Sequence, residues 1–457
     1  MLGRIIRKQF LEYLISLRFL VALILCLTVG VGATIVRTHA YGISLGDYRV
    51  NRVDHGREAR TYSHPFPLTY SGVSLDKKPT ALGIFYRGLE PSRPMSVRVT
   101  ANRDPRTEDQ FEQANLVADL FQTVDLMTFV ALVMGLRALV FSYDLISGEK
   151  EAGTLRLTLS FSVPRDKLVI GKWLGGYLAL AVPLVFTAIC SLAVVVISPS
   201  VSLSRGEFVA FAVLVLAAML YTGCFYSLGL MVSSMTTRAF TSITALIAVW
   251  VALTVGLPNV SPYLAHSLLP APSIQEVERE KWAIGKAEDD NRRSRAREYR
   301  RTTTDPQKVR GAVSAEFWRE SFANIARRQE EVQVSYERAL DTQVSAAMWF
   351  SRLSPTASVI YASSEISGTG ICDLRSFRKA LQAYRMRFLN YCEDKWIVRI
   401  NTDGGPISTS DYPRFSYIKA ELGDRVGTAL LDLGLLVVWN VIFFVTGYVG
   451  FLKYDVR

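Results

Sequence analysis

The sequence has little that could perform chemistry on a substrate. Its four histidines are spaced irregularly, with no cysteine or acidic frame that would complete a metal site; they are His39, His55, His64 and His266. It contains no G-x-x-x-x-G-K-[ST] phosphate-binding loop, no H-E-x-x-H and no G-x-S-x-G motif. We therefore expect a chain that is not an enzyme, with no catalytic residue, no metal and no cofactor of its own.

Cysteine is also scarce. Of the five cysteines, Cys26, Cys190 and Cys224 fall within apolar runs, where cysteine behaves as a small apolar residue. Cys372 and Cys392 are the remaining pair. If one helix joins them, they lie about 30 Å apart, whereas a disulfide bridges at most about 7 Å between Cα atoms. The sequence predicts no bond between them.

Long apolar runs dominate what is present. The chain is 50% hydrophobic, and six runs approach the roughly 20 residues that cross a bilayer. Backbone polar groups in lipid must bond within their own segment, so these runs are predicted helices. They are Phe19–Val36, Val124–Phe141, Leu168–Ile197, Phe208–Met231, Ala239–Leu257 and Val426–Leu452. The predicted fold class is an all-α polytopic membrane protein with six transmembrane helices.

The placement of basic residues predicts the orientation. Lys and Arg gather before the first span, between the second and third, and after the sixth, whereas the loop 198–206 carries only Arg205. Positive charge favours the cytoplasmic side, so both termini are expected there. The net charge of +11 then reflects topology. Contacts with anionic lipid headgroups are the alternative for part of it, and no nucleic-acid partner is expected.

The spans divide the chain into segments with different expected environments. Before the first span, a cytoplasmic amphipathic helix is predicted on the membrane surface; the alternative is a plain extension of that span. The predicted segments are 1–18 (amphipathic helix), 19–36 (first span), 37–122 (mixed α/β extracytoplasmic domain), 123–257 (spans two to five, with a cytoplasmic segment 142–166), 258–424 (mainly helical extracytoplasmic domain) and 425–457 (sixth span and cytoplasmic tail).

Local patterns predict elements in the two extracytoplasmic domains. In the first, Ala81–Tyr86 and Met95–Thr100 are predicted strands, and Glu108–Leu120 is a predicted helix. In the second, a highly charged stretch can bury little apolar surface. The elements expected there are a solvated helix or partly disordered segment at Glu276–Arg310, and helices at Ala315–Leu353 and Phe377–Ile397.

Three polar residues within the spans are candidates for a role in the bundle, because polar groups at membrane depth are costly. Arg137 lies in the second span and either faces the interior or extends to the cytoplasmic surface. Asp432 lies near the outer end of the sixth span, where solvent is expected to reach it. Asn440 is more central and is the better candidate for a contact between helices.

The segment Ser142–Arg165, SYDLISGEKEAGTLRLTLSFSVPR, is the most informative part of the chain. A loop that only reverses direction could be shorter and less charged, so this one indicates a binding site for a soluble partner. A short helix is predicted at Gly148–Leu159. Its Glu149 and Glu151 would be favoured by the helix dipole, and its leucines would provide apolar anchors.

The run Asp144–Leu157, followed by Pro164-Arg165 and Gly171-Lys172, resembles the signature of ABC transporter permeases of the second exporter type (ABC-2). In that family the segment after the second span carries an acidic pair before Gly-Thr-Leu, a Ser/Pro-Arg turn, and a lysine that opens the third span. The resemblance implies that the segment couples the permease to an ATPase. The residues it assigns to this coupling are Asp144, Gly148, Glu149, Lys150, Glu151, Gly153, Thr154, Leu155 and Arg156.

The resemblance also implies a function. The chain would be the permease subunit of an ATP-driven exporter in the bacterial inner (cytoplasmic) membrane. Its expected partners are two ABC ATPase subunits, which hold ATP and Mg, and a second permease, either a copy of this chain or a related one. The alternative is a membrane-anchored interaction protein that passes ATPase motion to a periplasmic partner without moving cargo.

A weaker likeness concerns the outer end of the protein. Trp349–Pro355 and Asp411–Phe415 are similar to a bacterial subgroup with long extracytoplasmic insertions. The usual member of the wider family has only a short re-entrant helical hairpin between spans five and six. This chain is expected to depart from that geometry, and the cargo is not identified by either likeness.

Overall fold

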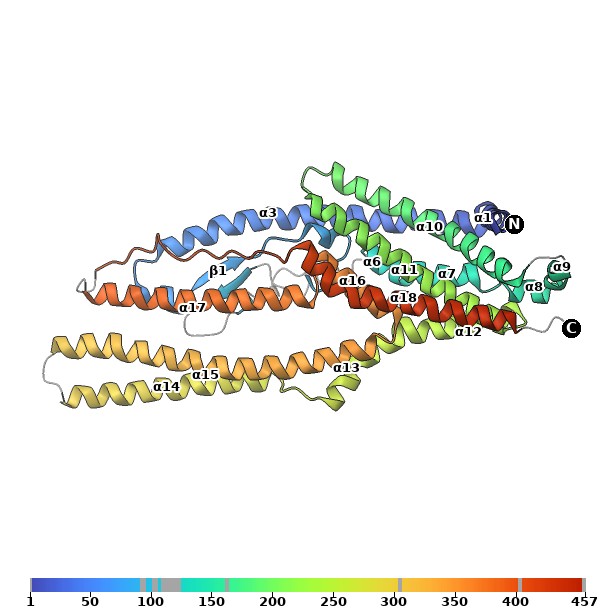
Figure 1. Cartoon of the computed structure of the whole chain (residues 1–457). Coiled ribbons are helices and arrows are strands. Elements are labelled where there is room, and N and C mark those ends of the chain that lie inside the picture. The colour runs from blue at the N-terminus through green and yellow to red at the C-terminus, as the bar shows by residue number, and fades with distance from the viewer. Residues whose placement is uncertain are drawn as a thin grey trace.

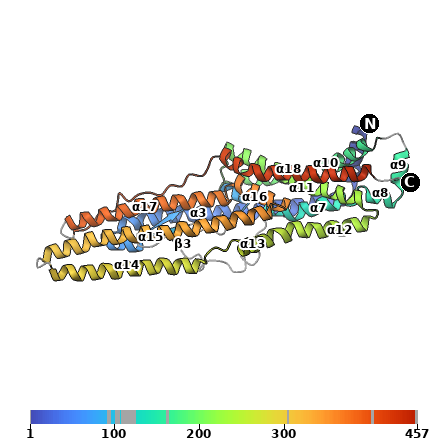
Figure 2. The same cartoon turned by 60° about the horizontal axis from the view of Figure 1, so that its bottom comes forward.

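The molecule is elongated and has two parts, as Figures 1 and 2 show. One is a bundle of apolar helices, with both chain termini at its outer end, which we call the terminal end. The other, which we call the extension, holds a small sheet and long helices. The computed structural model describes residues 2–90, 96–100, 106–107, 125–160, 164–302, 306–401 and 405–453 of the chain.

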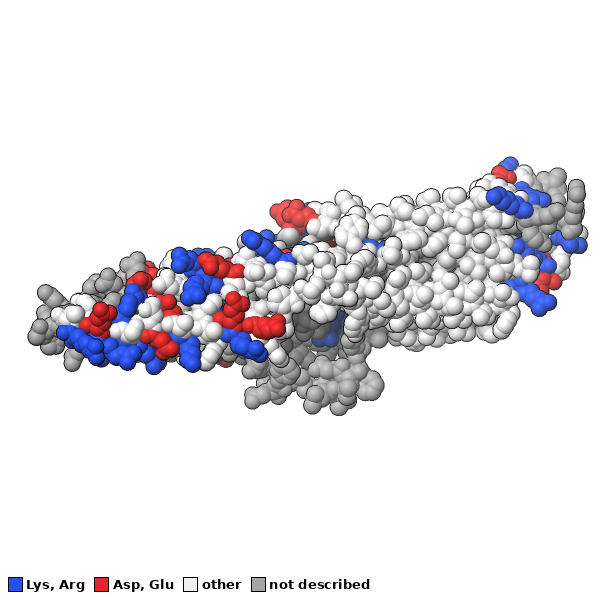
Figure 3. Space-filling view, turned by 90° about the horizontal axis from the view of Figure 1, so that it is seen from below, with Lys and Arg blue, Asp and Glu red and all other residues white. Residues whose placement is uncertain are grey.

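The bundle contains the apolar helices that the sequence predicts. Within the described residues, six helices are long and apolar enough to cross a membrane: Leu17–Thr61, Leu126–Glu151, Arg165–Ile197, Arg205–Met235, Ala239–Leu268 and Leu422–Leu452. The surface in Figure 3 shows an almost uncharged band between charged side chains at the terminal end and on the extension. This confirms the prediction of a multi-pass, mainly helical membrane protein.

The first apolar helix is much longer than the predicted span. It consists of α2 (Leu17–Leu25), a π-helical turn η1 (Cys26–Val31) and α3 (Gly32–Thr61). The prediction ended it at Val36. The helix continues because residues beyond that point keep an inward face, with Thr38, Leu45 and Ala59 buried. The start of the segment 37–122 is therefore helical.

A separate helix, α1 (Leu2–Ile15), precedes it. Extended backbone at Ser16, whose side chain caps α2, divides the two helices. Close approach to α10 (Arg165–Ile197) is possible because Gly171 and Gly175 leave room for Ile5 and Ile6. The alternative of a plain extension of the first span is therefore wrong.

Helix α11 lies deep in the bundle and packs against α7, α10, α12 and α18. Its Tyr221, Cys224, Phe225 and Tyr226 are essentially inaccessible to solvent. The elements are α6 (Leu126–Phe129), η5 (Val130–Met134), α7 (Gly135–Ser142), α10 (Arg165–Ile197), α11 (Arg205–Met235), α12 (Ala239–Val251), η6 (Ala252–Gly256), α13 (Leu257–Leu268) and α18 (Leu422–Leu452).

A small antiparallel sheet lies in the extension, in the order β1 (Val73–Asp76), β2 (Ser96–Val99) and β3 (Arg106–Thr107). It follows α4 (Pro65–Ser71) and pairs Val73 with Val99 and Leu75 with Val97. These side chains face a core shared with α17 (Ile371–Asn401). The strand predicted at Met95–Thr100 is confirmed as β2.

The second predicted strand of this region is wrong. Ala81–Tyr86 contains a 3-10 helix, η2 (Ala81–Ile84), and all six of its residues are buried. A strand on one surface of a core would expose alternate side chains, whereas this run is enclosed on all sides where the extension meets the bundle. The helix predicted at Glu108–Leu120 lies outside the described residues.

Long helices make up the rest of the extension. They are α14 (Ile274–Thr302), α15 (Pro306–Ser351), α16 (Pro355–Ser367) and α17 (Ile371–Asn401). The predicted helices at Ala315–Leu353 and Phe377–Ile397 are confirmed, and the charged stretch forms a helix, α14, that packs along α15 (Figure 1). Cys372 and Cys392 both lie on α17. One helix therefore joins them, as the argument against a disulfide between them assumed.

A hairpin joins the extension to the bundle. The chain turns after α15 and returns as α16, whose side chains are mostly buried beside α11 and α18. At the turn, Thr356 Oγ1 lies 3.3 Å from Tyr221 Oη and 3.2 Å from Thr254 Oγ1. The long helices of the extension are thus joined to the bundle through this turn. The expected departure from a short re-entrant hairpin stays a prediction.

A buried polar cluster ties the two halves of the extension together. Lys77 pairs with Asp373 at 3.1 Å, and Tyr417 donates to the same carboxylate at 2.7 Å. Lys419 donates to Thr80 Oγ1. Burial lowers the pKa of Lys419 to about 8, although the nearby Asp373 opposes this shift.

Lys419→Met is expected to flatten the pH dependence of stability between about pH 8 and pH 10. In that range the unfolded chain, with an ordinary lysine pKa of about 10.4, binds more protons than the folded protein. The wild-type free energy of unfolding therefore rises with pH, by about 3 kcal/mol for the whole shift. Thermal unfolding in detergent at several pH values measures this. Equal slopes in wild type and variant would contradict it, and the exposed Lys286→Met is the control.

Candidate functional site

The segment that resembles a coupling site lies at the terminal end of the bundle (Figure 1). It forms two helices, α8 (Ser147–Glu151) and α9 (Thr154–Ser160), rather than the single helix predicted at Gly148–Leu159. The break is at Gly153, whose φ of 71° lies in the left-handed region. Glycine adopts that conformation without the steric penalty that a side chain brings, so the sequence can turn sharply there.

The acidic residues of α8 point toward the bundle. Glu149 Oε1 lies 2.7 Å from Nζ of Lys172 on α10. Lys172 is buried and also donates to the backbone oxygen of Leu145 at 3.0 Å. This pair fastens α8 to α10. The carboxylate is engaged within the chain, so it is not available in this arrangement as a docking group.

Two further contacts fix α8 to the next helices. Lys150 Nζ donates to the backbone oxygens of Ser234 and, at 3.0 Å, Thr236, where α11 ends. Glu151 Oε2 accepts from the backbone N–H of Ala239 at 2.8 Å, where α12 begins. Each charge lies at the helix end that the macrodipole favours. The ends of α10, α11 and α12 are therefore held together through α8.

The turn before α8 is fastened to α11 and to the first apolar helix. Ser233 Oγ accepts from the backbone N–H groups of Ile146 at 3.0 Å and Ser147 at 2.9 Å. Asp144 pairs with Arg18 of α2 at 2.8 Å. Gly148 allows close packing, because a Cβ there would lie 3.2 Å from Asp144 Cβ.

Helix α9 presents the outward surface. Leu155 is 2% exposed and packs among Ile146, Leu168 and Phe451, which anchors the helix to the bundle. By contrast, Leu157 is 62% exposed, and Thr154 and Arg156 are exposed beside it. Of the nine predicted coupling residues, Asp144, Glu149, Lys150 and Glu151 make contacts within the chain and Leu155 is buried, whereas Thr154 and Arg156 face outward. The sequence did not distinguish these two sets.

Arg137 lies inside the bundle and does not reach the surface. Its Nη1 donates to Cys26 Sγ at 3.4 Å, and its guanidinium lies 5.1 Å from the centroid of the Phe141 ring. Asn440 makes the expected contact between helices. Its Nδ2 donates to the Leu220 oxygen of α11 at 2.8 Å.

The prediction that solvent reaches Asp432 is wrong. Asp432 is 1% exposed, and its two oxygens accept from Arg352 Nε at 2.7 Å and Nη2 at 3.0 Å. The hairpin covers this part of α18 and supplies the arginine. A lone carboxylate in an apolar helix was a signal that a cation partner exists, but the sequence did not indicate that Arg352 is that partner.

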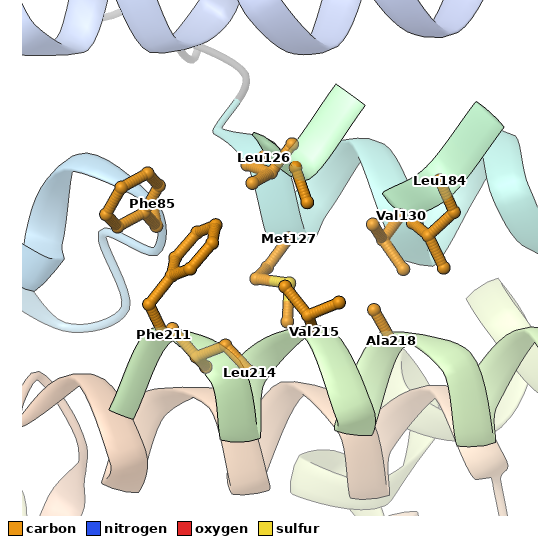
Figure 4. A pocket seen from close by; sticks show the side chains of 10 residues that line it. Phe85, Leu126, Met127, Val130, Leu184, Phe211, Leu214, Val215 and Ala218 are labelled. Carbon is orange, nitrogen blue, oxygen red and sulfur yellow. The ribbon is translucent and has the colours of Figure 1, made fainter. Parts of the chain in front are cut away.

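A small cavity lies between α6, α10 and α11 (Figure 4). Apolar side chains line it, including Phe85, Met127, Leu184 and Phe211, and its free volume is about 10 Å³. That is room for about one water molecule, so the cavity does not indicate a cargo. Among the described residues, no group of three or more His, Cys, Asp or Glu side chains could hold a metal ion.

Comparison with known proteins agrees with the likeness in the segment 144–172. A family model described as ABC-2 family transporter protein matches residues 4–456, nearly the whole chain. Over 77 residues the chain is 39% identical to a protein named "Probable ABC transporter permease protein NosY" from Pseudomonas aeruginosa. That match covers 17% of this chain and only 28% of the relative.

Glu149→Ala is expected to lower the free energy of unfolding by about 2 kcal/mol, because it leaves the buried Lys172 ammonium without its carboxylate. Glu149→Leu combined with Lys172→Met should recover at least half of the loss, since the unpaired charge is then removed. Thermal unfolding in detergent measures both variants, with the exposed Arg156→Ala as control. A double variant no more stable than the single one would contradict the role of the pair.

Proposed function

Because this chain belongs to the ABC-2 transporter family, we propose that it is the membrane permease subunit of an ATP-driven exporter in the bacterial inner membrane. The name of the partly matching relative, a probable ABC transporter permease, supports this assignment. In the proposed complex, two separate ABC ATPase subunits bind ATP and Mg. A second permease, a copy of this chain or a related one, completes the transporter.

The observation that carries the proposal is the joint between α9 and the bundle. A permease without a nucleotide site must receive force from a separate ATPase. The outward side chains of α9, Arg156 and Leu157, provide a mixed basic and apolar surface for docking. The contacts of Glu149 and Lys150 then pass a displacement of α9 to α10 and α11.

The proposed orientation places the terminal end in the cytoplasm, where the ATPase subunits are, and the extension in the periplasm. Basic residues near both termini support this under the positive-inside rule. The almost uncharged band of Figure 3 separates the two charged zones as a bilayer would.

Leu157→Asp combined with Arg156→Glu is expected to lower recovery of the ATPase subunit at least about tenfold, a loss of about 1.4 kcal/mol of binding free energy. The changes remove the apolar anchor and reverse the charge of the proposed surface. The measurement is co-purification from native membranes. Met386→Asp, an equally exposed apolar residue on α17, is the control. Normal recovery with the α9 variant would refute the docking assignment.

A second function is favoured by one observation, the continuity of α15. This helix has 46 residues, so it is about 69 Å long, and it leads directly into the hairpin that holds Arg352 against Asp432 of α18. Motion of α18 would therefore swing α14 and α15 as a lever. In this alternative the protein transmits ATPase motion to a periplasmic partner and moves no cargo.

Spin labels at Ser294→Cys, an exposed position on α14, separate the two functions. The protein carries Cys372→Ser so that its exposed native thiol is not labelled. If the lever transmits motion, the distance between labels in a paired complex should change on ATP binding, as measured by pulsed electron paramagnetic resonance. Arg352→Gln with Asp432→Asn should abolish the change. An unchanged distance in the fully active parent complex would rule out the lever.

A further inference from the structure

One face of α3 is apolar and uncovered. The residues on this face follow one another at alternating spacings of three and four, which gives the 3.5-residue repeat of a coiled-coil seam. The stripe consists of Gly32, Val36, His39, Ile43, Gly46, Val50 and Val53. Its three valines and its isoleucine are each more than half exposed. The opposite face, with Thr38, Leu45 and Ala59, is buried against the rest of the chain.

Lipid accounts for only the first part of this stripe. A hydrocarbon core of about 30 Å is crossed in about 20 helical residues, so a helix that enters it at Leu17 leaves it near Arg37. Ile43 and Val53 then lie about 9 Å and 24 Å beyond the core. That part of α3 runs along the edge of the extension, beside the sheet (Figure 1). Apolar side chains exposed there face water unless another surface covers them.

Two glycines of the stripe have no close neighbour among the described residues. A Cβ built on Gly32 or Gly46 would meet no atom within 4 Å in the part of the chain that the structure describes. Glycine inside a helix costs about 1 kcal/mol relative to alanine, and the packing of this chain does not require it at either position. Both glycines occupy the same position of the seven-residue repeat, because each lies seven residues from His39. A neighbouring helix that approaches closely would use this space.

The charges beside the stripe are complementary to a second copy of the same helix. Arg49 and Asp54 flank the seam on opposite sides, at the g and e positions of the repeat. In a parallel pair, a g residue of one chain faces the e residue five positions later in its partner. Arg49 of each chain therefore meets Asp54 of the partner subunit, and two-fold symmetry makes this pair twice.

We propose that α3 pairs in parallel with α3 of a second copy of this chain, along Ile43–Val53 and outside the bilayer. The pairing rests on the proposed function, since it takes the two permeases of one transporter to be copies of this chain. It gives the complex a seam on the extension side of the membrane. The helix runs along the length of the molecule (Figure 1), so a two-fold axis that is parallel to the bundle and passes beside the stripe would place the two α3 helices side by side.

Cysteine cross-linking in native membranes tests the seam. Val50→Cys, in a chain that also carries Cys372→Ser, is expected to form a covalent dimer under mild oxidation, because the two Val50 positions face each other. Arg52→Cys, which is exposed on the same helix but lies off the seam, is the matched control and is expected not to do so.

Charge reversal tests the register. Arg49→Asp alone and Asp54→Arg alone should each slow the Val50→Cys cross-link about threefold, which matches an exposed ion pair. The two reversals together should restore the rate, because the pair is rebuilt with opposite polarity. A cross-link that is insensitive to the single reversals would overturn the parallel register.

Co-purification of the same variants from native membranes separates this inference from the proposed function. If Val50→Cys gives no dimer while the complex retains two permease chains and its ATPase, the seam is wrong and the permease assignment stands. If the complex holds no ATPase, the proposed function fails whatever the cross-link shows. A cross-link from Val50→Cys to a different protein, or equal cross-linking of Arg52→Cys, would also overturn the seam.

Discussion

Polar groups inside an apolar bundle must find their partners within the protein, because lipid offers none. This constraint explains why charged residues of the chain lie where they do. Glu149 is held by Lys172, and Asp432 is held by Arg352. Each pair joins segments that are distant in sequence, and each lies where a helix of the bundle meets a segment outside it. These polar pairs fix the places where the segments meet, whereas apolar side chains fill the interior of the bundle.

The six apolar helices could be predicted because length and hydropathy alone decide them. The ends could not, because they depend on tertiary contacts. Nothing local stops the first helix at Val36, and the sheet beside it supplies a surface for Ala59. The run Ala81–Tyr86 shows the same limit, since burial on all sides removes the alternation that distinguishes a strand.

The candidate coupling segment was found from a sequence resemblance, but the roles within it were not. Charge density indicated a docking surface, and glutamates were the natural choice for contact with a partner. The structure instead turns Glu149 and Glu151 toward the bundle, and Gly153 reverses the chain so that α9 projects outward. Whether a charged side chain binds a partner or its own chain depends on a backbone conformation that composition does not reveal.

The two ends of the molecule are linked by a path of direct contacts. Helix α8 holds the end of α11 through Ser233 and Lys150, and α11 lies against α18 through Asn440. Asp432 of α18 in turn holds Arg352, from which α15 runs outward. A displacement at α9 therefore has a route to the extension, through the turn at Gly153, the contacts of α8, α11 and α18, and the turn that holds Arg352. If two copies of the chain are joined along the stripe on α3, α3 is held in place. The levers formed by α14 and α15 would then move relative to α3.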